Sequence, residues 1–147
     1  MPDAIAHAFE EGDEVVIESF LSGREVTCGV IHDGNELLAL PITELIPEGE
    51  YFDYDAKYEG KSQEITPADI PDEWRKNLQD VSKRIYRRIG LTGITRMDYI
   101  VSKDGTIYLI EVNTNPGFSP ASIVPQQLEA NGQKITPVLT AVINSVL

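Results

Sequence analysis

The chain has little cysteine, few basic residues and no long apolar run, and each shortage excludes a class of protein. Cys28 is the single cysteine, so no disulfide forms within the chain, and we expect a small buried side chain there. Only 12 Lys and Arg residues stand against 24 Asp and Glu, which gives a formal charge of −12 at pH 7 and disfavours nucleic acid as a partner. No stretch approaches the roughly 20 apolar residues of a membrane helix, and no signal-peptide pattern opens the sequence. We therefore expect a cytoplasmic protein without membrane contact.

The order of hydrophobic patterns predicts an α+β fold. A length of 147 residues suits one domain with a real core, but it is short for an enzyme with several substrates. A helix is predicted over 3–10, followed by strands over 13–21, 23–34 and 35–46, with Gly23 and Asp33-Gly34 as the breaks between the strands. A helix over 72–89, ended by Gly90, would bury a stripe that begins at Trp74 and ends at Ile89. A hairpin and two C-terminal helices follow, so we expect a mainly antiparallel sheet covered by helices.

The stretch 95–113 predicts a β-hairpin with two unlike faces. Asp104-Gly105 is a typical two-residue turn, because type I′ turns need positive φ at both central positions. The register then follows by counting outwards from the turn, since side chains alternate between the two faces. The polar face places Asp98 opposite Glu111 and Arg96 opposite Asn113. The apolar face places Met97 opposite Val112, Tyr99 opposite Ile110, and Val101 opposite Tyr108.

Two carboxylates that face each other across a hairpin call for a positive charge. Directly opposed side chains have Cβ atoms about 4.5 to 5.5 Å apart, so ionised Asp98 and Glu111 would repel each other. Mg²⁺ is a natural partner, because it prefers oxygen ligands and takes one or two carboxylates, with water and phosphates at its other positions. Asn113 adds a neutral carbonyl oxygen on the same face. Alternatively, Arg96 neutralises the pair in an ordinary surface network without a metal.

Common nucleotide-binding motifs are missing, but four segments carry a family resemblance. The sequence has no G-x-x-x-x-G-K-[ST] loop and no G-x-G-x-x-G turn after a strand. It does contain, in order, VVIESFLSGRE, FDYDAKY, TRMDY and EVNTNPGFSPASIVP. These segments resemble the C-terminal part of D-alanine–D-alanine ligases, which are members of the ATP-grasp superfamily. The likeness extends over nearly the whole chain, and EVNTNPGFSPASIVP with RMD upstream is its most specific part.

The resemblance implies a site for ATP and magnesium. The position of Glu18 would accept the adenine amino group, the backbone of Ser19, Phe20 and Leu21 would complete the adenine contact, and Glu25 would hold the ribose hydroxyls. Without the resemblance, Glu18 and Glu25 would be interpreted as exposed strand residues. Two Mg²⁺ ions, or Mn²⁺ in their place, would be bound by Asp98, Glu111 and Asn113.

The resemblance also implies residues that handle the reacting groups. Arg96 and the backbone N–H of Gly117 would bind the oxyanion that forms during the reaction. Ser122 and the backbone of Ile123 would hold the carboxylate of the second D-alanine, at a helix start where unpaired N–H groups favour an anion. The simpler alternatives are that Gly117 is an ordinary turn glycine and that Ser122 is a helix cap.

The aperiodic segment 47–71 is interpreted as a mobile lid. In the family, the loop that matches Lys57 and Tyr58 closes over the site, with the lysine facing the phosphates and Tyr58 on the substrate side. Such a lid would exclude water from a reactive acyl phosphate. A plain disordered loop is the alternative.

The family pattern further predicts what lies outside this chain. Residues 1–147 would be a single C-terminal ATP-grasp domain, without the amino-terminal domain that binds the first D-alanine and without the central domain that covers ATP. The complete enzyme would make D-alanyl-D-alanine for peptidoglycan from D-alanine and ATP, with a homodimer as one option, and the isolated chain would be nearly inactive. Alternatives are a ligase that makes D-alanyl-D-lactate or another peptide, a non-catalytic Mg-ATP-binding module, or a structural role.

Overall fold

The chain is described by a computed structural model that covers residues 2–47, 62–145 and 147. Its elements follow one another in the order helix, four strands, helix, hairpin and two helices. They are α1 (Pro2–Glu11), β1 (Arg24–His32), β2 (Leu37–Ala39), β3 (Thr43–Pro47), β4 (Ser62–Ile65), α3 (Asp72–Arg88), β5 (Ile94–Val101), β6 (Ile107–Asn113), α4 (Ile123–Ala130) and α5 (Ile135–Asn144).

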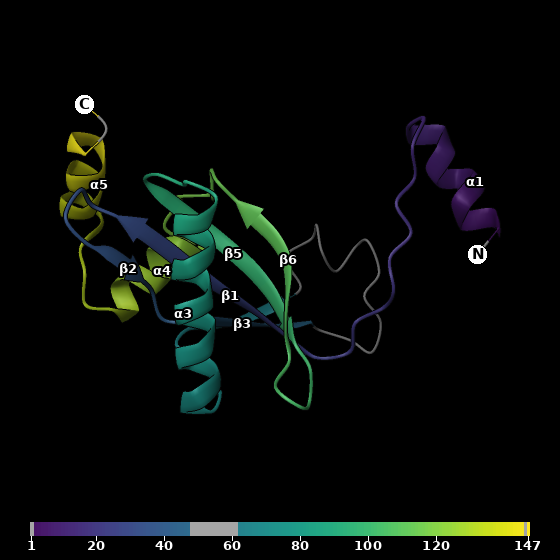
Figure 1. The fold of residues 1–147 in the computed structure, drawn as a ribbon, viewed down its shortest axis with the longest axis horizontal. Helices are drawn as coiled ribbons and strands as arrows, with labels where there is room; N and C mark the ends of the chain where they lie inside the picture. Colours follow the sequence, from purple (N-terminus) through teal and green to yellow (C-terminus); the bar gives the residue numbers. More distant parts are fainter. Residues whose placement is uncertain (1, 48–61, 146) are drawn as a thin grey trace.

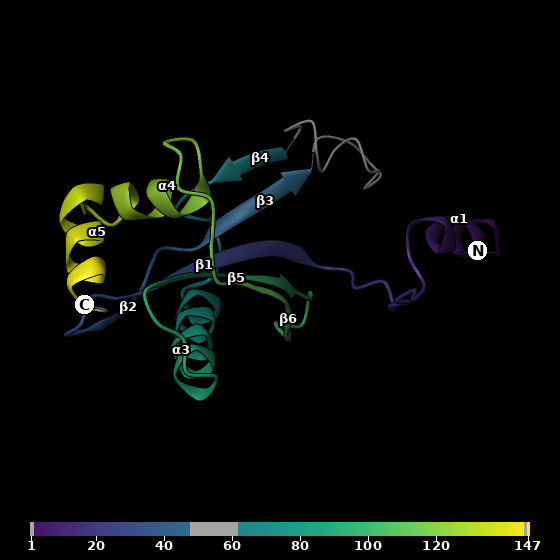
Figure 2. The ribbon, with the colours of Figure 1, turned by 90° about the horizontal axis from the view of Figure 1, so that it is seen from above.

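The strands form one antiparallel sheet with helices on both faces. The strand order is β4-β3-β1-β5-β6, and the short β2 pairs with β1 beside β3. Helix α3 covers one face, whereas α4 and α5 lie on the other (Figures 1 and 2). The predicted α+β architecture with an antiparallel sheet is therefore confirmed. Within the described residues, no helix is long and apolar enough to span a membrane.

The core divides between the two faces of the sheet. On the α3 face, β1 and β5 contribute alternate residues such as Cys28, Met97 and Tyr99, which pack against Leu78 of α3. On the other face, Ile31, Leu40, Val124 and Leu128 form a second cluster with residues of α5. Cys28 is fully buried as predicted, and this burial raises the pKa of its thiol to about 12. The alternation along β5 leaves its other face to Arg96 and Asp98.

Two of the predicted strands differ from the structure. The segment 13–21 is extended but is not a strand, because no strand in the described part of the chain runs beside it, and it leads away from the sheet to α1 (Figure 1). Its Val16 and Phe20 are 81% and 88% exposed. The segment 35–46 forms two strands instead of one. The break is at the buried Leu40 and Ile42, which flank Pro41, a residue with no N–H to continue a ladder.

The helix over 72–89 is confirmed, although its buried stripe differs from the predicted one. The helix itself ends at Arg88, and Gly90 follows with a positive φ of 70°, as expected for a residue just past a helix. Ile89 is 56% exposed because it lies beyond the last helical turn. The fully buried residues of the helix are Leu78, Ser82 and Tyr86. Three residues of the predicted stripe are only partly buried against the core: Trp74, Val81 and Ile85.

The hairpin has the predicted register where the carboxylates lie and a different one near its turn. Asp98 pairs with Glu111, Arg96 with Asn113 and Met97 with Val112. Beyond a bulge between Asp98 and Tyr99, Tyr99 pairs with Leu109 and Val101 with Ile107, so the predicted partners Ile110 and Tyr108 are wrong. The loop is longer than two residues because Ser102 N–H bonds to Thr106 O, while Asp104 Oδ1 accepts from Thr106 N–H. The bulge in β6 then restores the register at the carboxylates.

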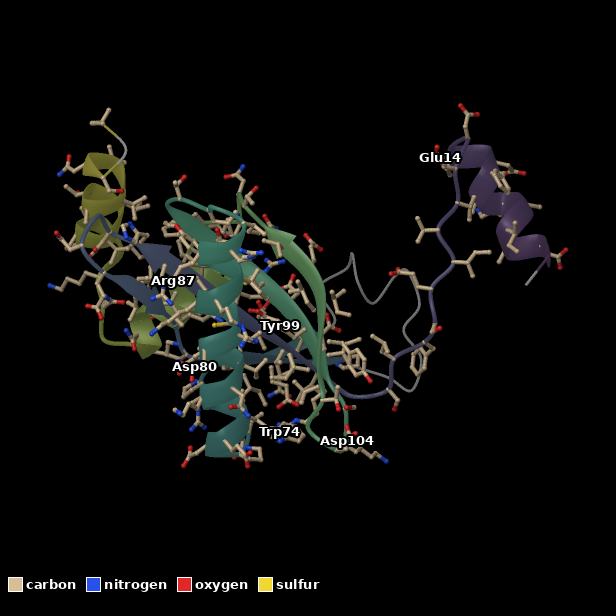
Figure 3. The ribbon with its side chains drawn as sticks, viewed as in Figure 1. Glu14, Trp74, Asp80, Arg87, Tyr99 and Asp104 are labelled. Carbon is tan, nitrogen blue, oxygen red and sulfur yellow. The ribbon has the colours of Figure 1, made fainter. Side chains whose placement is uncertain are left out.

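The loop of this hairpin rests on α3 through Trp74 (Figure 3). Gly105 has φ of +84°, and a Cβ there would lie 3.0 Å from Trp74 Nε1. We expect Gly105→Ala to lower the free energy of unfolding by about 1 to 2 kcal/mol from the positive φ, with a further loss from the contact. Gly132→Ala is the matched control, since its φ is +73° with nothing within 4 Å of the added Cβ. Urea denaturation that gave equal losses for both variants would contradict the Trp74 contact.

Candidate active site

Four polar side chains lie together on the α4 face of the β5–β6 hairpin. Arg96 and Asp98 are two residues apart on β5, and their partners on β6 are Asn113 and Glu111. The opposite face of β5 is fully buried, which fixes these two side chains on the open face. The sheet thus brings together the residues predicted from the sequence as an oxyanion donor and as metal ligands.

Arg96 makes a two-pronged ion pair with Asp98. Its Nε lies 2.9 Å from Asp98 Oδ1, and its terminal nitrogen lies 2.8 Å from Oδ2. Both side chains are largely covered, at 23% and 14% exposed. The hydrogen bond to Asp98 raises the pKa of Arg96, burial opposes this, and the charges of Glu111 and Glu64 add to the increase. The metal-free alternative is therefore realised in part, with Asp98 as the hydrogen-bonded carboxylate.

The donor set of the hairpin fits magnesium. Among the residues that the structure describes, no group of three or more Asp, Glu, His or Cys side chains is arranged for a metal. Asp98 and Glu111 supply two carboxylates and Asn113 an amide oxygen, which is what Mg²⁺ takes when phosphates and water complete its shell. Protein zinc sites are built mainly from imidazole and thiolate ligands, which these four residues do not offer. Asn113 Oδ1 also accepts a hydrogen bond from Asn115 N–H at 3.1 Å, which orients its amide.

The loop after β6 brings Gly117 next to Ser122. A Cβ on Gly117 would lie 3.0 Å from Ser122 Oγ, so the absence of a side chain allows this close approach. Ser122 precedes α4 but makes no side-chain cap bond. Its hydroxyl instead accepts from Ser119 N–H at 3.1 Å and lies 2.9 Å from Ser119 Oγ. Capping does not account for Ser122, and Ile123 begins the helix as a buried residue.

The residues predicted to bind ATP are only partly gathered here. Glu25 lies on β1 in the row next to Asp98, because it pairs with Ile100 of β5. Glu18, Ser19, Phe20 and Leu21 lie on the extended segment that leads away from the sheet. Lys57 and Tyr58 fall outside the described residues, so the lid stays a prediction. Within the range 47–71 that was predicted as a lid, residues 62–65 form the strand β4.

Two polar residues near the site were not predicted from the sequence. Glu64 of β4 accepts a hydrogen bond from Gln126 Nε2 at 2.7 Å and acts on Arg96 through its charge. Little in the sequence indicated a role for Glu64, because Glu64 lies in a segment without hydrophobic periodicity. Gln127 is fully buried under the sheet, where its Nε2 donates to Thr27 O and Thr43 Oγ1 and its Oε1 accepts from Gly29 N–H. Gln127 lies at helical spacing among the apolar residues Val124 and Leu128, and this pattern in the sequence could have predicted a buried polar side chain.

Comparison with known proteins matches the chain to a family. A family model described as the D-ala D-ala ligase C-terminus matches residues 1–144. The chain belongs to the D-alanine–D-alanine ligase family. The ligase of Porphyromonas gingivalis W83 is 47% identical over 144 residues, and that of Christiangramia forsetii is 50% identical over 140 residues. These alignments cover 98% and 95% of this chain but 44% and 43% of the relatives, so the chain spans less than half of their length and corresponds to their C-terminal part.

Solved structures of ligases share the fold. The VanG D-Ala:D-Ser ligase of Enterococcus faecalis superposes with a TM-score of 0.85 at 33% identity, over 99% of this chain and 43% of that one. The D-alanine–D-alanine ligase of Bacillus anthracis, solved in complex with ATP, gives a TM-score of 0.76 at 28% identity, over 98% and 45% of the two chains. The fold is therefore that of the C-terminal domain of an ATP-grasp ligase, as the resemblance implied.

Proposed function

We propose that this chain is the Mg-ATP-binding part of an enzyme that joins two D-alanine molecules. The observation that carries the proposal is the register that sets Asp98 directly opposite Glu111, with Asn113 beside them and Arg96 on the same face. Two adjoining carboxylates repel each other. Arg96 offsets this repulsion at Asp98 in the metal-free chain, and a phosphate-bound Mg²⁺ would supply further positive charge. The family relationship supports ATP as the source of that phosphate.

The reaction that fits this site has two transfers. A carboxylate oxygen of the first D-alanine attacks the γ-phosphorus of ATP, which forms an acyl phosphate and releases ADP. The amine of the second D-alanine then attacks the acyl carbon, loses a proton and expels inorganic phosphate. When bound by Asp98, Glu111 and Asn113, two Mg²⁺ ions would neutralise phosphate charge. Arg96 and the Gly117 N–H would stabilise the oxyanion, a contribution of about 3 to 4 kcal/mol per donor.

The remaining predicted residues have roles in binding. Ser122 and the N–H groups at the start of α4 would hold the carboxylate of the second D-alanine, because a helix start favours an anion. Glu18 to Leu21 and Glu25 would bind the nucleoside, and Lys57 and Tyr58 would close over it. The parts of the enzyme that lie outside this chain would cover the nucleotide and bind the first D-alanine. We propose that this activity lies in the cytoplasm, where the product would serve cell-wall synthesis.

A domain exchange tests the proposal. This chain would replace the matching C-terminal segment of the Porphyromonas gingivalis ligase, to which it is 47% identical. We expect the purified chimera to release ADP with D-alanine and to form D-alanyl-D-alanine, whereas the 147-residue chain alone gives negligible turnover. A coupled ADP assay and mass spectrometry of the product are the measurements. A folded chimera that lacked activity, or an isolated chain with robust turnover, would contradict the proposal.

The same assay addresses the second substrate. The structural match to a D-Ala:D-Ser ligase gives D-serine as a second candidate. D-alanine, D-serine and D-lactate would be compared as the second substrate of the chimera at the same concentration. Preference for D-serine would keep both steps and change the identity of the second substrate. Preference for D-lactate would keep the acyl phosphate step, but the nucleophile of the second step would be a hydroxyl and the product an ester.

A further inference from the structure

Asp98 has few neighbours that could orient it once a cation is bound. Both of its carboxylate oxygens accept hydrogen bonds from Arg96 in the metal-free chain. A divalent cation on the same carboxylate repels the guanidinium, so metal binding and the full Arg96–Asp98 pair compete. A carboxylate that binds a metal normally needs another hydrogen-bond partner to hold it in place.

Among the four residues that lie beside Asp98 on β5 or directly across from it, the donors are Arg96 and Thr27. On this face, the residues adjacent to Asp98 along β5 are Arg96 and Ile100. The residues across from it are Glu111 on β6 and Thr27 on β1. Ile100 has no polar atom and the Glu111 carboxylate only accepts hydrogen bonds. Directly paired side chains have Cβ atoms about 4.5 to 5.5 Å apart, so the Thr27 hydroxyl lies within reach of the Asp98 carboxylate.

Thr27 is buried with an unused hydroxyl. Its side chain is 0% exposed, and its Oγ1 has no hydrogen-bond partner among the described residues. A buried hydroxyl without a partner destabilises the folded chain. Its backbone position is held firmly, because Thr27 O accepts a hydrogen bond from Gln127 Nε2 at 3.0 Å. Thr43, the next residue in the row, is already engaged with Thr66 and Gln127.

We infer that Thr27 is the positioning residue that hydrogen-bonds to Asp98 when a divalent cation displaces Arg96 from it. The inference rests on the proposed metal site and deepens it. In the metal-free chain Arg96 donates hydrogen bonds to Asp98, and the Thr27 hydroxyl has no hydrogen-bond partner among the described residues. In the metal-bound chain Thr27 Oγ–H donates to Asp98, and Arg96 is released toward the substrate. The unpartnered hydroxyl thus destabilises the metal-free chain, and its hydrogen bond to Asp98 stabilises the metal-bound chain.

The test compares four variants of the 147-residue chain with the wild type. Mn²⁺, followed by electron paramagnetic resonance, is the metal probe, and thermal unfolding without metal is the second readout. Thr27→Val removes the hydroxyl at nearly constant shape, and Thr27→Ser keeps the hydroxyl. Thr95→Val is the matched control, because Thr95 Oγ1 is the other buried hydroxyl that lacks a partner in the described residues, on the opposite face of β5. Asp98→Asn tests the metal site itself.

We expect Thr27→Val to bind Mn²⁺ about tenfold more weakly or worse, the range found for outer partners of metal ligands. Its metal-free melting temperature should equal or exceed that of the wild type, as for Thr95→Val. Thr27→Ser should keep the affinity of the wild type while melting at a lower temperature, and Thr95→Val should keep the affinity. Thr27→Val would then be the more stable variant and Thr27→Ser the tighter metal binder. A purely structural role of the Thr27 hydroxyl would not produce these opposite orders.

Three other results overturn the inference. If Thr27→Val binds Mn²⁺ as well as the wild type while Asp98→Asn does not, the metal site stands and Thr27 has no part in it. If Thr27→Val melts well below Thr95→Val without metal, its hydroxyl already has a structural partner. If the wild type does not bind Mn²⁺, or Asp98→Asn binds it equally well, the proposed metal site fails and the role of Thr27 fails with it.

Discussion

Asp98→Asn is expected to reduce product formation by the active chimera about a hundredfold to a thousandfold, because the several kcal/mol of charge stabilisation that a metal site supplies convert to factors of this size. The substitution keeps the shape of the side chain and one carbonyl oxygen. It removes the negative charge that pairs with Arg96 and that the proposed cation would require. The loss should appear mainly in kcat, and excess Mg²⁺ should restore only part of it.

A matched charge change elsewhere provides the control. Asp80→Asn alters the net charge by the same amount on the exposed face of α3, where Asp80 lies 3.9 Å from Lys76 (Figure 3). We expect its activity to match that of the unaltered chimera, since exposed ion pairs contribute about 0 to 1 kcal/mol to stability. Equal activity of the Asp98→Asn and Asp80→Asn chimeras would show that the hairpin face takes no part in the reaction.

The hairpin shows why part of the site could be predicted and part could not. The face of each residue follows from side-chain alternation, so a one-residue error would have exposed Met97 and Tyr99, and burial selects the correct register on β5. The turn depends on local competition for hydrogen bonds. Asp104 accepts bonds from Ser102 and Thr106, which lengthens the loop, and the bulge on β6 compensates. The prediction at Asp98 and Glu111 was correct although the turn from which it was counted was not.

The rest of the site depends on contacts that a local pattern does not encode. The segment 13–21 alternates well enough for a strand, but a strand also needs a neighbour, and none of the described strands runs alongside it. The ion pair between Arg96 and Asp98 follows from their shared face, whereas the influence of Glu64 requires β4 to lie in the same sheet. Long-range pairing of this kind is invisible to periodicity.

Gln127→Leu is expected to lower the free energy of unfolding by about 2 to 6 kcal/mol, because two buried backbone groups would each lose a partner at about 1 to 3 kcal/mol. Gln127 spans the stretch of β1 between its pairings with β3 and β2. There it satisfies Gly29 N–H and Thr27 C=O, and leucine satisfies neither. Small domains have total stabilities of about 5 to 15 kcal/mol, so this variant should unfold at much lower urea concentration.

The neighbouring glutamine and a charged variant make the prediction specific. Gln126→Met removes hydrogen bonds that are exposed, and it should cost less than about 1 kcal/mol. Gln127→Glu keeps an acceptor for Gly29 N–H but loses both donated bonds and buries a charge. Burial raises the pKa of the introduced carboxyl in the folded state, so stability should fall as the pH rises above about 4.3, the value in the unfolded chain. Equal losses for Gln126→Met and Gln127→Leu would mean that α4 is not anchored to β1 through this side chain. Strand β1, which pairs with β5 at Arg96 and Asp98, would then be held by its strand pairing and by apolar packing.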